Sequence, residues 1–434
     1  MTSLPLPPGQ LGLPLIGETP SFLLDPRFAA KRQRRYGNFF KTHILGSPTV
    51  VFIGPEGCEF LLSSHMQHFA WKGGWPQNFQ ELLGESLFLQ DGETHRRNRR
   101  LMMPAFHGKA LEGYFSTMMN LAEQYQQDWA QQDELTVFPA MKQFTFEVAS
   151  VLLVGSPPGA PIDQLSQWFT DLTNGLFAPP LRWRWLPYGR ALRARDRLLT
   201  YIEEMIQTRQ ANPTQDVLGL LLQTEDEAGN RLSQEEIKVQ TLLMLFAGHE
   251  TTTSLLTSLM MMLGQHPAVL QQAREEQDAL AATGTLTLDQ LKQMPYLDQV
   301  LKETERLYPP VGGGFRQVIK PFEFKGYRVP AGWLALYRIN ETNRAAYAAP
   351  DRFDPDRFSP GRAEHRPSDY SLVSFGGGPR VCLGLAFAKM EMKIFAALLL
   401  RRYTWRLAAN QDLSMKPIPT LRPASGLKLS LARR

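Results

Sequence analysis

The stretch that decides the fold of this 434-residue chain is 375–384, which reads Phe-Gly-Gly-Gly-Pro-Arg-Val-Cys-Leu-Gly. It places a cysteine in a glycine-rich loop, and apolar side chains at helical spacing follow it. A cysteine just before a helix lies near the positive end of the helix dipole, which favours the thiolate. Glycines let the backbone approach a flat, bulky partner, and Arg380 can bind an anion beside the sulfur. These features together describe a site for a haem and its propionates.

A lone cysteine is more often a buried structural thiol, so the loop by itself leaves that alternative open. The pattern Phe-x-x-Gly-x-Arg-x-Cys-x-Gly, however, resembles the haem-thiolate signature of the cytochrome P-450 superfamily. The resemblance implies that Cys382 is the metal ligand of haem b, the axial thiolate on its iron. The remaining cofactor-binding residues that the motif implies are Phe375, Gly376, Arg380 and Gly384.

Composition is that of a soluble globular protein, with 43% hydrophobic and 21% charged residues. Only two cysteines are present, Cys58 and Cys382, which excludes a disulfide scaffold and a cysteine-rich zinc site. The net charge of +5 comes without a nucleic-acid-binding motif, so no nucleic-acid partner is expected. Cys58 is expected to be an inert buried thiol.

The N-terminal segment 1–20 is rich in proline and lacks the charged and apolar regions of a signal peptide. A run of about 20 apolar residues, which a membrane-spanning helix needs, is not found in the sequence. We therefore expect one domain over residues 1–434, soluble, cytoplasmic and monomeric, without a membrane span. A chain from which a membrane anchor has been removed would look the same.

A predicted helix at 92–100 carries four arginines in five positions, which in most proteins form a solvated face. In the P-450 superfamily the corresponding helix binds the haem propionates through Trp-x-x-x-Arg, and His95 and Arg99 have this spacing. His95 stands where tryptophan is commoner, although both side chains can donate to a carboxylate. The resemblance gives Arg316 the same role, as a third propionate ligand.

A capping box at 233–236 opens a predicted helix of roughly thirty residues, or about 45 Å, which ends before Pro267. Its centre, 247–252, resembles the oxygen-binding motif of the superfamily. Glu250 and Thr251 would then be the catalytic acid and alcohol that manage protons. Without the resemblance, an ordinary threonine-rich helix would be the better interpretation.

Two further motifs follow in the order that the superfamily shows. Glu303 and Arg306 form a Glu-x-x-Arg pair, and Arg357 resembles the third member of a buried Glu-Arg-Arg cluster. Loss of one partner would leave a buried charge unpaired, at a cost of roughly 3–5 kcal/mol. Asn343 stands where many members have histidine, which leaves the local hydrogen bonding open.

The resemblance covers the whole chain and implies a mainly α fold with a small β region. The haem would be buried between the long central helix and the cysteine loop. The implied function is haem-thiolate monooxygenation of a hydrophobic small molecule, such as a retinoid, another isoprenoid or a fatty acid. The segments 247–252, 294–303 and 309–316 most resemble the cyanobacterial and animal retinoic-acid hydroxylases. Five residues are expected to line the substrate pocket: Trp75, Phe177, Phe246, Ala247 and Gly313.

Electrons are expected from a separate donor of the ferredoxin or flavodoxin type. It would dock on cations of the helices at 92–100 and after Cys382, namely Arg96, Arg97, Arg100, Lys389 and Lys393. Two alternatives remain: a haem-thiolate isomerase or dehydratase that works without O2, and a non-catalytic haem sensor or carrier. The sequence leaves open the substrate, the carbon oxidised and the native donor.

Overall fold

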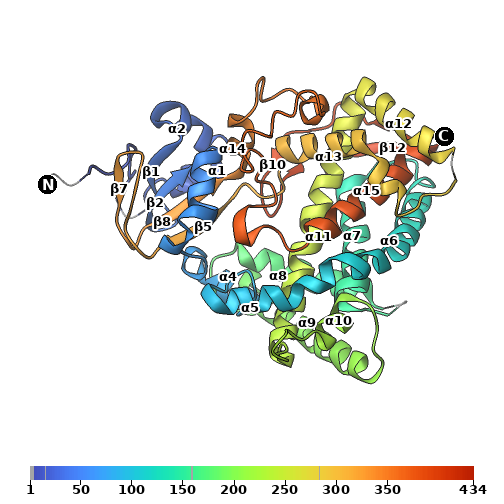
Figure 1. Cartoon of the computed structure of the whole chain (residues 1–434), viewed down its shortest axis with the longest axis horizontal. Coiled ribbons are helices and arrows are strands. Elements are labelled where there is room, and N and C mark those ends of the chain that lie inside the picture. Colours follow the sequence, from blue (N-terminus) through green and yellow to red (C-terminus); the bar gives the residue numbers. More distant parts are fainter. Residues whose placement is uncertain (1–3, 15, 158–159, 283) are drawn as a thin grey trace. The chain divides into compact units, whose positions relative to one another are not determined.

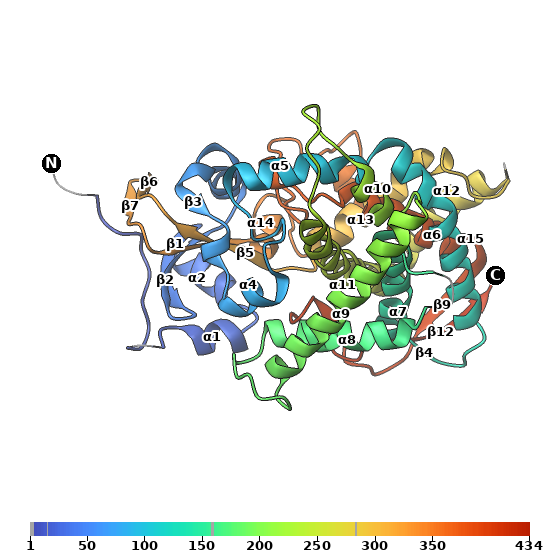
Figure 2. The ribbon, with the colours of Figure 1, turned by 90° about the horizontal axis from the view of Figure 1, so that it is seen from below.

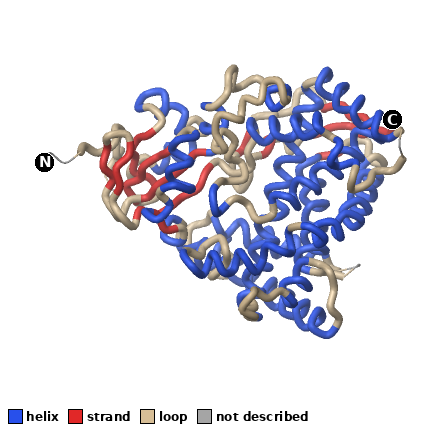
Figure 3. Tube along the Cα trace, viewed as in Figure 1, coloured by secondary structure: helices blue, strands red, loops and turns tan. Residues whose placement is uncertain are grey.

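The structure, a computed structural model, describes residues 4–14, 16–157, 160–282 and 284–434. Residues 1–3 and 15 of the predicted proline-rich segment lie outside this part. Helices dominate and the strands form small sheets (Figure 3), as the sequence predicts. The chain divides into two compact units, one of residues 1–76 and 305–382 and one of residues 77–304 and 383–434. A single domain over residues 1–434 stays a prediction.

The first unit is built on a five-stranded sheet (Figure 1). Its strands, in spatial order, are β1 (Phe39–Ile44), β2 (Ser47–Phe52), β8 (Leu334–Arg338), β5 (Gly313–Val318) and β3 (Phe69–Ala70). β2 and β8 run parallel, and the other neighbours run antiparallel. The hairpin predicted around Lys325 is confirmed, because β6 (Phe322–Phe324) and β7 (Tyr327–Val329) pair antiparallel across it. The helices of this unit are α1 (Thr19–Leu24), α2 (Phe28–Tyr36), α3 (Pro55–Glu59) and α14 (Ile339–Ala345).

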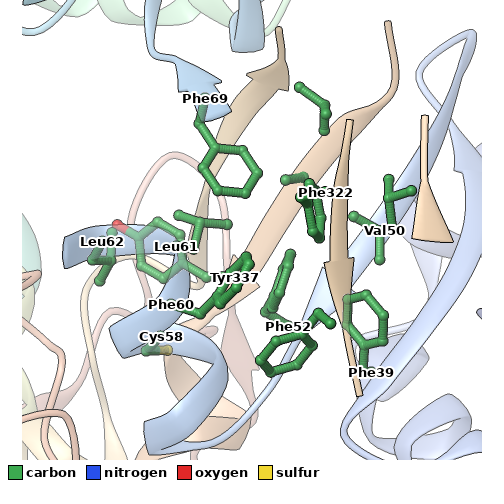
Figure 4. Packing of buried hydrophobic residues seen from close by; sticks show 14 of the residues in the cluster. Phe39, Val50, Phe52, Cys58, Phe60, Leu61, Leu62, Phe69, Phe322 and Tyr337 are labelled. Carbon is green, nitrogen blue, oxygen red and sulfur yellow. The ribbon is translucent and has the colours of Figure 1, made fainter. Parts of the chain in front are cut away.

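An aromatic core fills one face of this sheet (Figure 4). The Phe52 ring lies 4.9 Å from the Phe39 ring and 6.0 Å from the Phe60 ring, and the Phe39 ring lies 4.9 Å from that of Phe324. Cys58 is completely buried in this core, and its sulfur lies 3.5 Å from the Thr342 hydroxyl. The predicted burial of this thiol is confirmed, and burial raises the pKa of Cys58 to about 12, which disfavours the reactive thiolate.

The second unit is a set of packed helices, which Figure 2 shows from another side. Its small sheet joins β4 (Leu135–Thr136), β12 (Lys428–Arg433) and β9 (Tyr403–Leu407), and β10 (Met415–Lys416) pairs with β11 (Arg422–Pro423). Its helices are α4 (Gln77–Leu83), α5 (Gly92–Met102), α6 (Gly108–Trp129), α7 (Val137–Ala149), α8 (Ile162–Leu176), α9 (Pro187–Ala211), α10 (Val217–Gln223), α11 (Gln234–Gln265), α12 (Pro267–Ala281) and α15 (Leu385–Arg402). α13 (Pro295–Leu307) crosses the boundary between the units.

α11 is the long helix that the sequence predicts, with 32 residues. Its capping box is present: the Ser233 hydroxyl accepts from the Glu236 N–H, and the Glu236 carboxylate accepts from the Ser233 N–H. Pro267 opens the next helix, α12. Most of α11 is buried, so both ends and the packing agree with the sequence pattern.

One helical stretch of the described chain, Val137–Val154, is long and apolar enough to cross a membrane by length and composition alone. Of its residues, 61% are buried inside the protein, where α7 packs against α11. Such burial is that of a core helix of a folded protein.

Candidate active site

The cysteine loop is closed by its own backbone. The Cys382 N–H donates to the Phe375 carbonyl at 2.9 Å, and a short 3-10 turn, Gly378–Arg380, lies between them. The loop ends just before α15, and Cys382 is exposed whereas Cys58 is buried. An exposed sulfur at the start of a helix can reach a ligand from outside the chain.

Two glycines of this loop, Gly376 and Gly378, differ in how closely the rest of the chain approaches them. Gly378 has a φ of +61°, and a Cβ there would lie 2.4 Å from the Leu62 carbonyl oxygen, so its glycine is required by packing within the chain. Gly376 also has a positive φ, but a Cβ there would contact only the Arg380 carbonyl oxygen, at 3.8 Å. The sequence predicts that these glycines let the backbone approach a bound partner. At Gly378 the group that comes close is instead the Leu62 carbonyl of the same chain.

Two guanidinium groups gather on one aromatic ring beside this loop. The Arg316 Cζ lies 3.0 Å and the Arg380 Cζ 4.5 Å from the centre of the Trp71 ring. Arg316 is buried, and one of its nitrogens donates to the Phe315 carbonyl at 2.7 Å. Two cations held this close favour an anion between them, such as a carboxylate.

Asn343 anchors the chain just ahead of the loop. Its Oδ1 accepts from the Val373 N–H at 3.0 Å, and its Nδ2 donates to the Ser374 hydroxyl at 2.8 Å. That hydroxyl donates in turn to the Glu305 carbonyl at 3.0 Å. Asn343 is fully buried, so its amide fixes the two residues before Phe375. These bonds are the local hydrogen bonding that the sequence left open at Asn343, where many family members have histidine.

Arg306 and Arg357 both donate hydrogen bonds to the backbone of the loop around Arg352. Both donate to the Arg352 carbonyl, at 3.1 and 3.2 Å. Arg306 also donates to the Pro350 carbonyl, and Arg357 pairs with Glu364 at 3.0 Å. The two arginines are almost fully buried, as is Glu303 on α13. The structural role of all three residues stays a prediction. The hydrogen bonds of the two arginines indicate that part of this role is to fix the loop around Arg352.

The second unit contains the other predicted propionate ligands. His95 and Arg99 lie four residues apart, and hence on one face of α5. His95 is buried and Arg99 is partly exposed. The helix itself is as predicted, and the propionate contacts of these residues stay a prediction.

The middle of α11 differs from the rest of this buried helix. Ala247 is exposed, and Phe246, Gly248 and Thr251 are partly exposed, whereas the flanking turns are buried. The Thr251 hydroxyl donates to the Ala247 carbonyl at 2.9 Å, as predicted from its position. A Cβ on Gly248 would lie 2.9 Å from a methyl group of Leu153, so a larger residue there would have to displace the end of that side chain. This open face on a buried helix offers room for a ligand.

Glu250 faces the protein core. Its side chain is only 4% exposed, and the Lys142 Nζ of α7 lies 2.7 Å from its Oε1. Burial raises the pKa of Glu250, but charged neighbours, Lys142 among them, lower it by more, so the carboxyl stays ionised. The sequence places acid and alcohol side by side, whereas the structure turns the carboxylate toward Lys142 and leaves Thr251 partly exposed.

His249 completes this buried group. Its Nδ1 contacts the Leu245 carbonyl at 3.1 Å, its Nε2 lies 3.6 Å from Glu250 Oε1, and its ring packs on Phe146 and Phe169. Burial lowers the pKa of His249 from 6.5 to about 4, so the ring is neutral near pH 7.

This neutral histidine predicts a pH dependence of stability. Above pH 6.5 the ring is neutral in both states; between pH 6.5 and about 4 only the unfolded chain takes up the proton. Lowering the pH through this window should therefore cost roughly 3 kcal/mol of unfolding free energy at this residue. Urea unfolding of His249→Gln and of the wild type at several pH values would measure it. Parallel pH profiles of the two proteins would contradict it.

The five predicted pocket residues are divided between the units. Trp75 and Gly313 belong to the first, where the Trp75 ring lies edge-on to Phe315 at 6.0 Å. Phe177, Phe246 and Ala247 belong to the second, where Phe177 contacts Phe79 and is 48% exposed. Their common contact with substrate stays a prediction. A cavity of about 350 Å³ among α6, α7 and α8 includes none of the five.

Sequence reasoning missed Lys142, Trp71 and the anchoring role of Asn343. Lys142 stands in an apolar helix pattern, and a lone lysine there was the available signal. Trp71 precedes a short 3-10 helix, and no motif marked it as the ring beneath two arginines.

Comparison with known proteins gives a consistent result. The family model described as Cytochrome P450 matches residues 7–431. The putative cytochrome P450 120 of Synechocystis sp. is 40% identical over 99% of this chain and 98% of that protein. Cytochrome P450 26B1 of Mus musculus is 35% identical over 98% of this chain and 86% of that protein. The predicted cyanobacterial and animal relatives are thereby confirmed.

A solved structure described as "Retinoic acid bound cyanobacterial CYP120A1" superimposes with a TM-score of 0.92 at 39% identity, covering both chains completely. The mainly α fold that the sequence predicts is confirmed. The residues of the first unit also fit the family's haem, because an exposed cysteine and two guanidinium groups on one ring are the kinds of group that bind its iron and its carboxylates. The chain belongs to the cytochrome P450 family and is a haem-thiolate monooxygenase.

Proposed function

We propose that this monooxygenase hydroxylates a retinoid, with retinoic acid as the first candidate. The observation that carries the proposal is the retinoic acid bound to the CYP120A1 structure, which matches this chain over its whole length. The open face of α11 around Ala247 supports it, because an elongated apolar substrate needs such a surface beside the haem.

We assign Cys382 as the axial ligand, because Cys58 is buried with a raised pKa and Cys382 is exposed before α15. Phe375, Gly376 and Gly384 complete the loop. Arg316 and Arg380 bind propionate in the first unit, where both approach Trp71. His95 and Arg99 are the propionate donors of the second unit. When bound, the haem supplies O2 activation, which the electron density of the thiolate promotes.

The protein's own groups hold the protons. The Thr251 hydroxyl lies on the open face of α11 and donates to the Ala247 carbonyl, which leaves its oxygen able to accept. Glu250 is kept ionised by Lys142, so it can take up a proton and release it. This pair disfavours an isomerase or dehydratase, which needs no proton delivery. Oxygen uptake coupled to reductant would separate the enzyme from a sensor or carrier.

The substrate is tested by titrating retinoic acid and fatty acids into the haem protein and following the Soret band. Ala247→Leu places a bulkier side chain on the open face, so retinoic acid should bind about tenfold more weakly, while the thiolate–CO band is kept. Ala279→Leu, on the exposed face of α12, is the matched control and should bind as the wild type does. Retinoic acid without any spectral effect on the wild type, beside a clear response to a fatty acid, would refute the retinoid.

Members of the family take electrons from a partner protein and bind hydrophobic substrates. We propose a ferredoxin or flavodoxin as donor, and a monomeric, cytoplasmic enzyme.

The five cations predicted to bind the donor differ in their ion pairs and in their exposure. Arg97 pairs with Glu236 and Lys393 with Asp298, both at 2.8 Å and both partly buried. Arg96 forms an exposed pair with Glu93 on α5, whereas the exposed Arg100 pairs with Asp226, whose side chain is only 7% exposed.

The exposed Arg96–Glu93 pair contributes little and opens easily, so Arg96 is the better candidate for docking, together with Lys389, which forms no ion pair among the described residues. Arg96→Glu combined with Lys389→Glu should slow the first electron transfer by about tenfold at low salt. The wild-type rate should fall as salt shortens the Debye length from about 10 Å at 0.1 M to about 3 Å at 1 M. Peroxide-driven turnover is the internal control, and Lys428→Glu on β12 is the matched variant. A salt-independent rate would place the donor elsewhere.

A further inference from the structure

Two histidines lie side by side at the edge of the aromatic core of the first unit. His65 follows the helical turn Phe60–Ser64, and His68 ends a short 3-10 turn in which its N–H donates to the His65 carbonyl at 3.0 Å. The two ring centres lie 6.1 Å apart, with an angle of 37° between the rings. Both residues are partly exposed, so the pair is open to solvent. Neither of them is among the predicted haem or substrate residues.

Hydrogen bonds fix the tautomer of both rings. The Ser64 hydroxyl donates its only hydrogen to the Glu59 carboxylate at 3.1 Å, so its oxygen accepts from His65 Nδ1 at 2.9 Å. His68 Nδ1 lies 3.2 Å from the Pro321 carbonyl oxygen, which can only accept. Each neutral ring therefore carries its hydrogen on Nδ1 and a lone pair on Nε2. Among the described residues, Nε2 of neither ring has a hydrogen-bond partner.

Packing also holds the two rings in place. The His65 ring stacks on Phe60 at 4.0 Å with an angle of 12°, and the His68 ring lies edge-on to Phe322 at 6.3 Å. Phe60 and Phe322 belong to the buried aromatic core that Figure 4 shows. Packing alone would be served equally well by phenylalanine, and it does not explain the hydrogen bonds to both Nδ1 atoms. A ring whose Nδ1–H donates to a carbonyl, or to a group linked to a carboxylate, is typical of histidines that bind a metal through Nε2.

We propose that His65 and His68 together bind a divalent transition metal ion of the Zn²⁺ or Cu²⁺ type. Imidazole nitrogen suits these ions, whereas Mg²⁺ and Ca²⁺ prefer oxygen ligands. A Zn–N bond is about 2.1 Å long, which places an imidazole centre roughly 3 Å from its metal, so two rings 6.1 Å apart can share one ion. No group of three metal ligands is found among the described residues, so water completes the coordination and the ion exchanges readily. The inference does not depend on the retinoid.

The site lies on a segment that packs against the cysteine loop. A Cβ at Gly378 of that loop would lie 2.4 Å from the carbonyl oxygen of Leu62, three residues before His65. An ion that joins His65 to His68 would hold this turn in one conformation. Zn²⁺ should therefore slow amide hydrogen exchange in residues 60–68.

The test is isothermal titration calorimetry of the untagged haem protein with zinc chloride. The wild type should bind one Zn²⁺ ion per chain, Cu²⁺ should bind more tightly, and excess Mg²⁺ should not compete. His65→Phe and His68→Phe keep the aromatic packing and remove one ligand each, so each should weaken Zn²⁺ binding about a hundredfold. Ser64→Ala keeps both imidazoles but releases the His65 ring from its hydrogen bond, and it should weaken binding about tenfold.

His107→Phe is the matched control and should bind Zn²⁺ as the wild type does. His107 also has Nδ1 near a backbone carbonyl, that of Met103 at 3.1 Å, but it contacts no second histidine among the described residues. All variants should keep the thiolate–CO spectrum, since the altered residues are exposed or partly exposed. The proposal is overturned if the wild type does not bind Zn²⁺, if Mg²⁺ binds equally well, or if the variant that lacks both histidines still binds Zn²⁺ as the wild type does. An equal loss in His107→Phe would also overturn it, because the ion would then bind to scattered surface histidines.

Discussion

Histidine in place of Cys382 is expected to abolish the strongly red-shifted Soret band of the reduced, CO-bound protein and to reduce hydroxylation to the background level. Imidazole is neutral and donates less electron density to iron than a thiolate does, so the activation of O2 would fail even where haem is retained. Difference spectra of the reduced protein with and without CO, together with haem content, measure both parts of the prediction.

Cys58→Ala is the matched control, because it removes the other cysteine of the chain. Cys58 is fully buried, and the raised pKa keeps it a thiol, so it cannot serve as a thiolate ligand. The variant should lose some stability through the small cavity in the aromatic core and keep the red-shifted band. If Cys58→Ala lost the band and Cys382→His kept it, the ligand assignment would be wrong.

Short sequence patterns predicted the features that depend on contacts between residues close together in the chain. The capping box at Ser233 and Glu236 starts α11, and the turn at Lys325 joins two short strands. The hydroxyl of Thr251 bonds to the preceding turn, as its place in the helix implies. Each of these contacts joins residues at most seven positions apart, so the sequence alone carries the information.

Contacts between distant segments were not predictable in this way. Nothing near Glu250 in the sequence points to Lys142, since their contact exists only because α7 packs against α11. For the same reason Arg97 and Lys393 looked like open docking cations, whereas the fold supplies each with a carboxylate. Motifs identified which residues matter, and tertiary packing decided what each one touches.

Lys142→Met is expected to lower the free energy of unfolding by about 3–5 kcal/mol, because it leaves the buried Glu250 carboxylate without its cation. Part of this loss should be relieved by protonation of Glu250, so the variant should become relatively more stable as the pH falls toward 5. Glu250→Gln combined with Lys142→Met removes both charges and should recover most of the stability. Urea unfolding of the two single variants, the double variant and the wild type gives the coupling energy directly.

The same variants separate folding from proton delivery. The double variant should fold well but consume reductant without matching product, releasing hydrogen peroxide, because the proposed proton carrier is absent. Thr251→Ala should behave likewise in turnover while unfolding as the wild type does, since its hydroxyl is partly exposed and bonds only to the Ala247 carbonyl. A double variant that is stable and fully coupled would show that Glu250 and Lys142 serve packing alone, and that Thr251 receives its protons from solvent.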